Sequence, residues 1–297
     1  MHVPVMLGEC LEYLALRPDG VYLDATAGLG GHTGAIAQGL RTGFVIANDR
    51  DAESLDQARR NTAEWAQRIV FHRGSFGELP AALEQAGVER VDGLLADLGV
   101  SRYQLLDPAR GFSLMGEGPL DMRMDRSQGT TADDIINLTS EKELADLIYR
   151  FGEERRSRRI SRAIVRARPI HSTQRLSSVI ESAVPRTSKI HPATQTFMAL
   201  RMAVNDEPGE LDRLLSAAPE LVKSGGRIVI LTFMSLEDRQ VKQSFQALAR
   251  AGRATILTKH VIKPSPDEVK RNPPSRSAKL RALEMRSENH GNPGNHF

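Results

Sequence analysis

Short apolar segments that alternate with helical patterns are the feature that most constrains the fold of this chain. The helical pattern at residues 53–69 is a clear example. Five segments have the continuous apolar character of buried strands, at residues 21–25, 44–49, 69–74, 91–99 and 227–233. Strands that alternate with helices form parallel sheets, because each crossover helix returns the chain to the same end of the sheet. The sequence therefore predicts an α/β fold.

The alternation breaks after Gly99. A loop rich in Gly, Pro, Asp and Arg follows at residues 106–131, and loops of this length usually have a function or are disordered. Helical patterns then dominate from Ala132 to about Leu221 before the sheet resumes. We predict a discontinuous sheet domain at residues 1–104 and 206–297, interrupted by a mostly helical insert at residues 105–205. Residues 254–260 and 278–286 are predicted as closing strands.

Composition excludes several classes of protein. No stretch approaches 18 consecutive apolar residues, and the N-terminus lacks the pattern of a secretory or transit signal. The single cysteine, Cys10, cannot form a disulfide within the chain, which suits a reducing cytoplasm. The eight histidines show no zinc-binding spacing. We expect a cytoplasmic protein with no membrane partner and no metal.

Positive charge is concentrated in one segment. From Glu141 to Asn205 there are 13 Lys or Arg and 6 Asp or Glu, a net charge of +7, whereas the rest of the chain has a net charge of −4. Eight arginines lie between Arg150 and Arg168, and a helical projection places five of them on one face: Arg155, Arg158, Arg159, Arg162 and Arg166. A solvated charged face is the usual explanation, but few acids balance these arginines. We therefore favour phosphate binding and a polyanionic partner.

A glycine-rich turn follows the first predicted strand. The sequence Gly28-Leu29-Gly30-Gly31-His32-Thr33 supplies two glycines of the dinucleotide fingerprint and lacks the third. Asp24 ends the preceding strand, and Asp49 ends the next strand 21 residues after Gly28, where an acid can bind ribose hydroxyls. An acid at a strand end followed by two glycines is typical of S-adenosylmethionine sites. A tight packing turn and an NAD site remain alternatives.

Two further strand ends support a ligand site. Phe76 follows the third strand and is predicted to pack on an adenine ring, and Asp97 ends the fourth strand. Ligands of parallel sheets bind at the carboxyl ends of the strands. Asp24, Asp49, Phe76 and Asp97 are therefore expected to converge, although Phe76 is equally compatible with core packing and Asp97 with capping a turn.

Several long motifs resemble those of one family. They are DATAGLGGHT, DGLLADLGVS, GPLDMRMD, FGEERRSRRISRAI, HPATQTFMALRMAVNDE, FMSLEDRQVK and NPPSRSAKLRA, and they extend over nearly the whole chain. The chain resembles the bacterial 16S rRNA cytosine-N4 methyltransferases, the RsmH or MraW family. The resemblance implies a Rossmann-like class I methyltransferase sheet with an inserted helical domain. It also implies methylation of a decoding-centre cytidine, with 16S rRNA or the small ribosomal subunit as partner.

The resemblance also implies site residues. The residues expected to bind S-adenosylmethionine are Gly30, Gly31, His32, Asp49, Phe76, Asp97 and Gln104. Three positions depart from the family pattern: Met234 replaces a histidine, Gln195 replaces an arginine, and Arg102 replaces a serine. These departures concern the RNA side of the site rather than the cofactor side.

The chemistry of cytosine narrows the catalytic candidates. The exocyclic amine needs alignment and a hydrogen-bond acceptor, and Asp97 is the predicted catalytic residue. Carbon methylation would need a thiolate, and Cys10 lies in the first helical segment. Phe112 and the Met122–Met124 stretch are candidates for holding the target base. Packing in the core is an equally good explanation for them.

Two further motifs suggest local structure. Ser235 and Asp238 resemble a helix-capping box, and Asn205 is expected at a helix end.

Other functions remain open on these residues. A non-catalytic RNA-binding protein that retains the fold is one alternative, and an amino-methyltransferase acting on another nucleic acid is a second. A dehydrogenase-like enzyme is disfavoured by the missing third glycine.

Overall fold

The computed structural model describes residues 4–114, 116–127, 129–184 and 191–287. The chain divides into two compact units. The sheet unit comprises Met1–Gly99 and Glu210–Phe297, and the helical unit comprises Val100–Gly209. The predicted boundaries lay at residues 104/105 and 205/206, against 99/100 and 209/210 in the structure.

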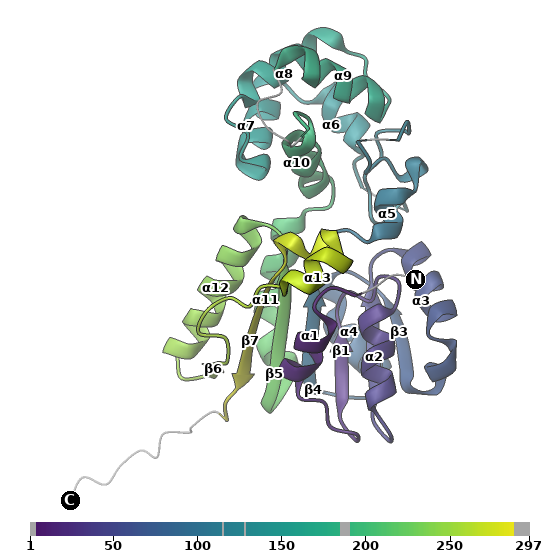
Figure 1. The fold of residues 1–297 in the computed structure, drawn as a ribbon, viewed down its shortest axis with the longest axis vertical. Helices are drawn as coiled ribbons and strands as arrows, with labels where there is room; N and C mark the ends of the chain where they lie inside the picture. The colour runs from purple at the N-terminus through teal and green to yellow at the C-terminus, as the bar shows by residue number, and fades with distance from the viewer. Residues whose placement is uncertain (1–3, 115, 128, 185–190, 288–297) are drawn as a thin grey trace, which may run out of the picture. The chain divides into compact units, whose positions relative to one another are not determined.

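The sheet of the first unit has seven strands within the described residues, in the order β3-β2-β1-β4-β5-β7-β6 (Figure 1). The strands are β1 (Val21–Asp24), β2 (Phe44–Asp49), β3 (Ile69–Arg73), β4 (Val91–Asp97), β5 (Val222–Thr232), β6 (Ala254–Ile256) and β7 (Lys279–Met285). Strands β1 to β5 are parallel, and β7 runs antiparallel to both β5 and β6. The predicted α/β fold with a Rossmann-like class I methyltransferase sheet is therefore confirmed.

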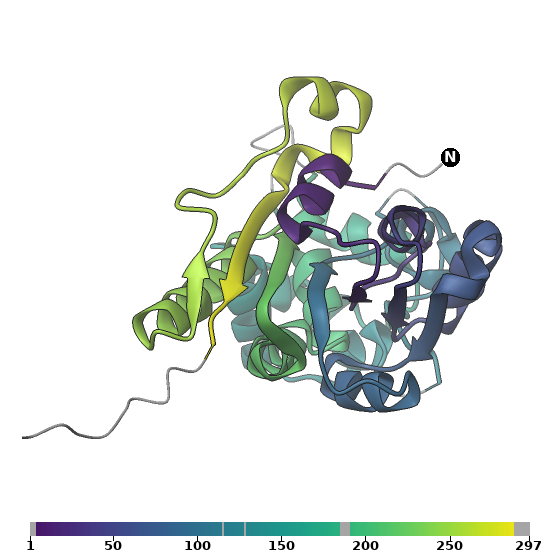
Figure 2. The ribbon, with the colours of Figure 1, turned by 90° about the horizontal axis from the view of Figure 1, so that it is seen from below.

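Helices cover both faces of this sheet (Figure 2). Helices α1, α2 and α3 pack on one face, and α4, α11 and α12 pack on the other. The bounds are α1 (Leu7–Leu14), α2 (Gly31–Gly39), α3 (Ala52–Asn61), α4 (Leu79–Gln85), α11 (Glu207–Leu221), α12 (Ser235–Arg250) and α13 (Pro266–Arg271), with short 3₁₀ turns η1 (Ala63–Arg68), η2 (Phe76–Glu78) and η4 (Pro273–Ser277). Successive strand residues point to opposite faces, so Tyr22 joins one core and Leu23 the other. Burial on both faces explains the continuous apolar runs in the sequence.

The helical unit has its own core. Its elements are α5 (Arg102–Leu106), η3 (Pro108–Arg110), α6 (Ala132–Leu138), α7 (Glu141–Gly152), α8 (Ser157–Ala167), α9 (Thr173–Ala183) and α10 (Thr194–Val204). Apolar residues of α6 to α10 form one buried cluster with residues of the long loop. The buried Arg110 organises that loop, because its guanidinium donates to the carbonyls of Arg123 and Met124. In the described part of the chain, no helix has both the length and the apolar character needed to cross a membrane.

Candidate active site

The carboxyl edge of the sheet brings the predicted strand-end residues together. Strands β3, β2, β1 and β4 are neighbours and run parallel, so their last residues lie at one edge. Asp24, Asp49 and Asp97 each end one of these strands, and Phe76 opens the 3₁₀ turn after β3. The four residues predicted to converge therefore occupy the same edge of the sheet unit.

Asp49 holds the glycine turn. Its Oδ2 accepts a hydrogen bond from the backbone N–H of Gly28 at 2.8 Å, and its Oδ1 accepts from that of Asp51 at 2.9 Å. Burial raises the pKa of Asp49 to about 6, although both N–H groups act to lower it. Each carboxylate oxygen has a second lone pair, so a ligand hydroxyl can still donate to this group.

The two glycines after Leu29 permit close packing of the turn. Gly30 has a φ of +85°, and a Cβ there would lie 2.8 Å from Cγ2 of Thr62. A Cβ on Gly31 would lie 2.6 Å from Cγ of Pro4. The N–H of Gly30 donates to the Ala27 carbonyl at 2.7 Å. The N–H groups of Gly31 and His32 belong to the first turn of α2, where a helix offers no acceptor, and they remain the better placed donors for a ligand.

The buried side chain of Asp24 holds the glycine turn through hydrogen bonds. Its side chain is fully buried, and its Oδ2 accepts from the Thr33 hydroxyl at 2.6 Å while its Oδ1 accepts from the Thr26 N–H at 3.2 Å. Burial raises its pKa to about 6. The Thr26 hydroxyl in turn accepts from the N–H of Asp97 at 2.6 Å. Sequence reasoning missed both threonines, although Thr26 follows a strand-end aspartate by two residues, the spacing of an Asx turn.

Asp97 has the most perturbed carboxyl group of this edge. Its Oδ1 is buried and has no hydrogen-bond partner among the described residues, whereas its side chain as a whole is 23% exposed. Burial raises its pKa to about 8, with further contributions from the negative charges of Asp24 and Glu237. A carboxyl group of this kind is typical of functional sites.

His32 lies beside Asp97 as a neutral ring. Its Nε2 is 3.1 Å from the Val5 carbonyl, and its Nδ1 is 3.7 Å from Oδ2 of Asp97. Burial lowers the pKa of His32 to about 4, so the ring is uncharged at neutral pH. A carbonyl only accepts, so Nε2 must carry the proton and Nδ1 faces Asp97 as an acceptor. The prediction for His32 concerned its backbone, and the contact of its side chain with Asp97 was not anticipated.

Phe76 has its backbone tied to α11. Its N–H donates to Oε2 of Glu210 at 2.9 Å, and Oε1 of Glu210 accepts from Arg213 at 2.8 Å. The ring is partly buried against the core beneath it. This placement leaves part of the ring exposed at the carboxyl edge, and its predicted contact with adenine stays a prediction.

Gln104 belongs to the helical unit, unlike the other predicted cofactor residues. Its Oε1 accepts from the N–H of Ser101 at 2.9 Å, and its own N–H donates to the Ser101 hydroxyl at 3.2 Å. This reciprocal pair is a capping box at the start of α5. A structural role is thus established for the side chain, and its role in cofactor binding stays a prediction.

The structure corrects the predicted capping box of α12. Met234 occupies the N-cap position, and the carboxylate of Glu237 accepts from the N–H groups of Phe233 and Met234, each at 3.1 Å. Asp238 instead pairs with Arg281 at 2.6 Å. The cap therefore lies one residue earlier than predicted, with Met234 rather than Ser235 at the N-cap and Glu237 rather than Asp238 three residues later.

Several candidate RNA-side residues have structural partners within the helical unit. Phe112 and Met122 are buried in its core, and Met124 packs against it. Asn205 ends α10, where its side chain accepts from the Met124 N–H and donates to the Met122 carbonyl, each at 2.8 Å. This agrees with the helix-end expectation for Asn205.

Two departures from the family pattern also lie in this unit. The carbonyl of Gln195 approaches Gly152 so closely that no side chain fits there. The side chain of Arg102 lies outside the described residues.

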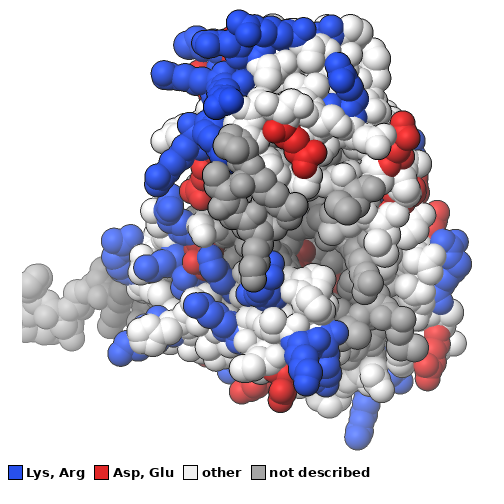
Figure 3. Space-filling model, turned by 45° about the horizontal axis from the view of Figure 1, so that its top comes forward, with Lys and Arg blue, Asp and Glu red and all other residues white. Residues whose placement is uncertain are grey.

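Four of the five arginines of the predicted face lie on α8, and Arg155 lies in the turn before it. Ile160 and Ile164 are buried in the core of the helical unit. The five arginines predicted on the opposite face are all exposed: Arg155, Arg158, Arg159, Arg162 and Arg166. Of these, Arg162 contacts Glu141 at 3.3 Å. Figure 3 shows Lys and Arg side chains gathered over one side of the helical unit.

Comparison with known proteins adds independent findings. A family model described as the MraW methylase family matches residues 1–286. Ribosomal RNA small subunit methyltransferase H of Solibacter usitatus is 68% identical over 286 residues, which cover 96% of this chain and 100% of that protein. The protein of the same name from Koribacter versatilis is 48% identical over 294 residues, which cover 95% and 93% of the two chains. A solved structure of a putative rRNA methylase from Clostridium thermocellum has a TM-score of 0.49 and 11% identity, covering 96% of this chain and 100% of that one.

Proposed function

The chain belongs to the MraW methylase family, and from this premise we propose that it transfers a methyl group from S-adenosylmethionine to small-subunit ribosomal RNA. The observation that carries this proposal is the 68% identity over 96% of the chain with a small-subunit rRNA methyltransferase. We further propose that the acceptor is the exocyclic N4 of a cytidine in the decoding centre. The motif resemblance and the chemistry of the carboxyl edge support this finer statement.

The residues of the carboxyl edge fit S-adenosylmethionine. Gly30 and Gly31 have no side chains, so a ligand can approach the backbone at these two positions. The N–H groups of Gly31 and His32 suit a carboxylate, and Asp49 suits the ribose hydroxyls. We propose Phe76 as the contact for the adenine ring, with Gln104 as a further cofactor residue. When bound, S-adenosylmethionine supplies an electrophilic methyl group.

Asp97 is the proposed catalytic residue. The N4 lone pair of cytosine is delocalised into the ring, so the amine needs to be held in line and its hydrogens accepted. The unpartnered Oδ1 of Asp97 is an acceptor available for an N4–H group. A carboxyl group with a pKa of about 8 is also a suitable base for the proton that the amine loses on methylation. Nδ1 of the neutral His32 lies 3.7 Å from the other oxygen and can accept from it only while the carboxyl group is protonated.

The environment of Cys10 argues against methylation at carbon. Its side chain is fully buried in the core formed by α1 and the sheet. Burial raises the pKa of its thiol well above the usual value, and the negative charge of Asp97 acts in the same direction. A thiolate nucleophile is therefore disfavoured at this position, while methylation of an amine needs no nucleophile from the protein.

Nucleoside analysis tests the proposal. Small-subunit rRNA from a strain that lacks this protein would be compared by mass spectrometry with rRNA from the same strain complemented with it. We expect an N4-methylated cytidine only in the complemented strain. A 5-methylcytidine or a ribose-methylated product would overturn the proposed chemistry, and identical nucleosides in both strains would overturn the proposed substrate.

A further inference from the structure

The sheet unit carries a basic surface of its own, separate in sequence from the arginine face of α8. We call it the α13 surface. Five of its basic residues are exposed and form no ion pair in the described part of the chain: Lys259, Lys263, Lys270, Arg271 and Arg276. The same segment contains two acids, Asp267 and Glu268, and the side chain of Glu268 accepts a hydrogen bond from the Met6 N–H at 2.6 Å. With five basic residues and two acids, this segment has a net charge of +3.

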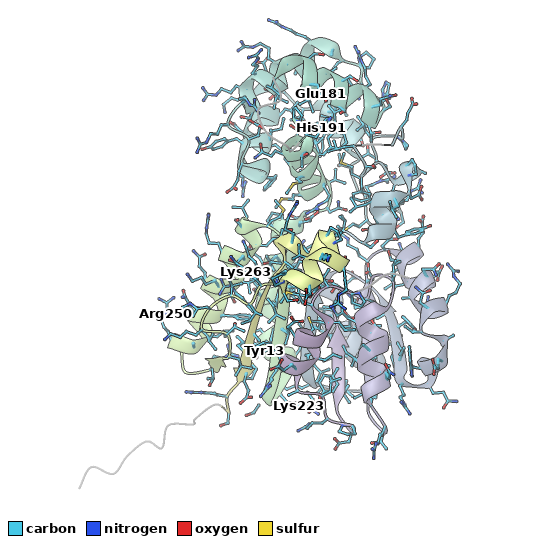
Figure 4. All side chains as sticks on the ribbon, viewed as in Figure 1. Tyr13, Glu181, His191, Lys223, Arg250 and Lys263 are labelled. Atoms are coloured by element: carbon cyan, nitrogen blue, oxygen red, sulfur yellow. The ribbon has the colours of Figure 1, made fainter. Side chains whose placement is uncertain are left out.

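Strand pairing places this surface at the carboxyl edge of the sheet. Strand β7 begins at Lys279, which lies opposite Thr232, the last residue of β5. The segment before α13 joins the same edge, because the N–H of Ile262 donates to the Leu280 carbonyl at 3.1 Å. Lys263 lies beside α13 at this end of the sheet unit, whereas Lys223 lies at the opposite end (Figure 4).

The N-terminal segment connects α13 to the glycine turn. Glu268 of α13 accepts from Met6, and the carbonyl of the preceding Val5 contacts His32. His32 is itself 3.7 Å from Asp97. A continuous series of contacts within the sheet unit therefore connects α13 to Asp97, the proposed catalytic residue.

We propose that the α13 surface binds the phosphates of the substrate RNA next to the nucleotide that is methylated; this inference rests on the proposed function. The proposed reaction requires a polyanion to approach an edge that already holds Asp24, Asp49 and Asp97. Asp24 and Asp49, with pKa values of about 6, are ionised at neutral pH and repel phosphate, and positive charge on the same unit offsets this repulsion. Exposed Lys and Arg side chains without ion-pair partners provide this attraction at little desolvation cost, and the displaced counterions favour binding.

A charge-removal experiment with a matched control tests the inference. The test variant is Lys263→Gln, Lys270→Gln, Arg271→Gln. The control is Arg41→Gln, Arg90→Gln, Arg250→Gln, which removes three exposed charges at the amino ends of β2 and β4 and at the end of α12. A third variant, Lys263→Arg, Lys270→Arg, Arg271→Lys, retains the charge. For each protein, the dissociation constant for small-subunit rRNA would be measured across a salt series, together with S-adenosylmethionine affinity and methyl transfer.

We expect the test variant to bind the RNA about 10- to 100-fold more weakly and its slope of log affinity against log salt to fall by about 2–3. The charge-retaining variant and the control should keep the wild-type slope, and all variants should keep their S-adenosylmethionine affinity. An unchanged slope in the test variant, or an equal loss in the control, would overturn the inference while wild-type methyl transfer leaves the proposed function standing. Absence of methyl transfer by the wild type would overturn both.

Discussion

The charged side chains at the carboxyl edge of the sheet and those on the arginine face of α8 differ in their exposure to solvent. At the edge, burial raises the pKa of Asp24, Asp49 and Asp97 well above the ordinary value of a carboxyl group. On α8, the arginines stand in solvent above a buried apolar face. The charged groups of the first region are thus desolvated, whereas those of the second are exposed to solvent.

The difference predicts how each region should respond to mutation. A desolvated charge interacts strongly with a few fixed partners, so the loss of one residue has a large and specific effect. An exposed arginine contributes a small, salt-dependent share of the total attraction to phosphate. Single substitutions should therefore suffice at the sheet edge, whereas several are needed on α8.

The largest expected effect is that of Asp97→Asn on turnover. The substitution keeps the shape of the side chain but removes its charge and one acceptor. We expect the rate at saturating S-adenosylmethionine to fall by a factor of about 10²–10⁴, as for other positioned proton acceptors. Methyl incorporation into small-subunit rRNA measures the rate, and a separate binding titration detects any loss of cofactor affinity. A fully active variant would remove Asp97 from the mechanism and leave the reaction itself in place.

The next effect is that of Asp49→Ala on cofactor binding. The variant loses the proposed ribose acceptor, and its affinity for S-adenosylmethionine should fall by about 1–3 kcal/mol. Asp51→Ala is the matched control, because the Asp51 side chain caps α3 by accepting from the N–H groups of Glu53 and Ser54. The control should lose stability and keep its affinity. Calorimetry that finds equal affinities for wild type and Asp49→Ala would rule out Asp49 as the ribose acid, and tighter binding of NAD would contradict the cofactor.

A smaller effect is expected for the arginine face. Replacing Arg158, Arg159 and Arg162 with Gln should lower the slope of log RNA affinity against log salt by about 2–3 and leave S-adenosylmethionine binding unchanged. The helix should remain folded, because its buried face of Ile160 and Ile164 is untouched. If the salt slope of the variant equals that of the wild type, these arginines do not bind RNA phosphates. The arginine face would then be only a solvated surface of the helix.

The sequence predicted those features that depend on local pattern. Strand ends are visible as apolar runs that stop at Asp24, Asp49 and Asp97, and the parallel topology then brings them to one edge. The exposed face of α8 likewise follows from helical periodicity. A local pattern does not reveal how deep a strand-end residue lies, so Asp24 was grouped with ligand residues although it is fully buried beneath the turn.

Local sequence patterns did not predict the contacts between segments that are distant in the chain. The His32 ring contacts the carbonyl of Val5, which lies 27 residues away, and the backbone of Phe76 is held by Glu210, 134 residues away. The cap of α12 was misplaced by one residue, because two acids follow one another there. In the structure Asp238 pairs with Arg281, whereas Glu237 accepts from the backbone at the start of the helix.

The smallest expected effect concerns stability and isolates Asp97 by pH. In the folded ligand-free protein its pKa is raised to about 8 from an ordinary 3.8. Between these values the folded state holds a proton that the unfolded state releases, so the free energy of unfolding falls as pH rises and levels off above pH 8. Asp24 and Asp49 act with the same sign, but only up to their folded pKa values of about 6. His32 acts with the opposite sign, from about 4 up to its ordinary value of 6.5.

The interval from pH 6.5 to pH 8 therefore reports mainly on Asp97. Thermal unfolding of the ligand-free wild type, followed by circular dichroism, should show a melting temperature that declines across this interval. Asp97→Asn cannot ionise, so its melting temperature should stay level and exceed that of the wild type at pH 8. Asp92→Asn, at the other end of β4, is the control, because salt bridges and hydrogen bonds lower the pKa of Asp92 and keep it ionised throughout. Parallel curves for wild type and Asp97→Asn would mean that Asp97 is already ionised in the folded protein, and the contrast between a desolvated edge and a solvated arginine face would fail at its central residue.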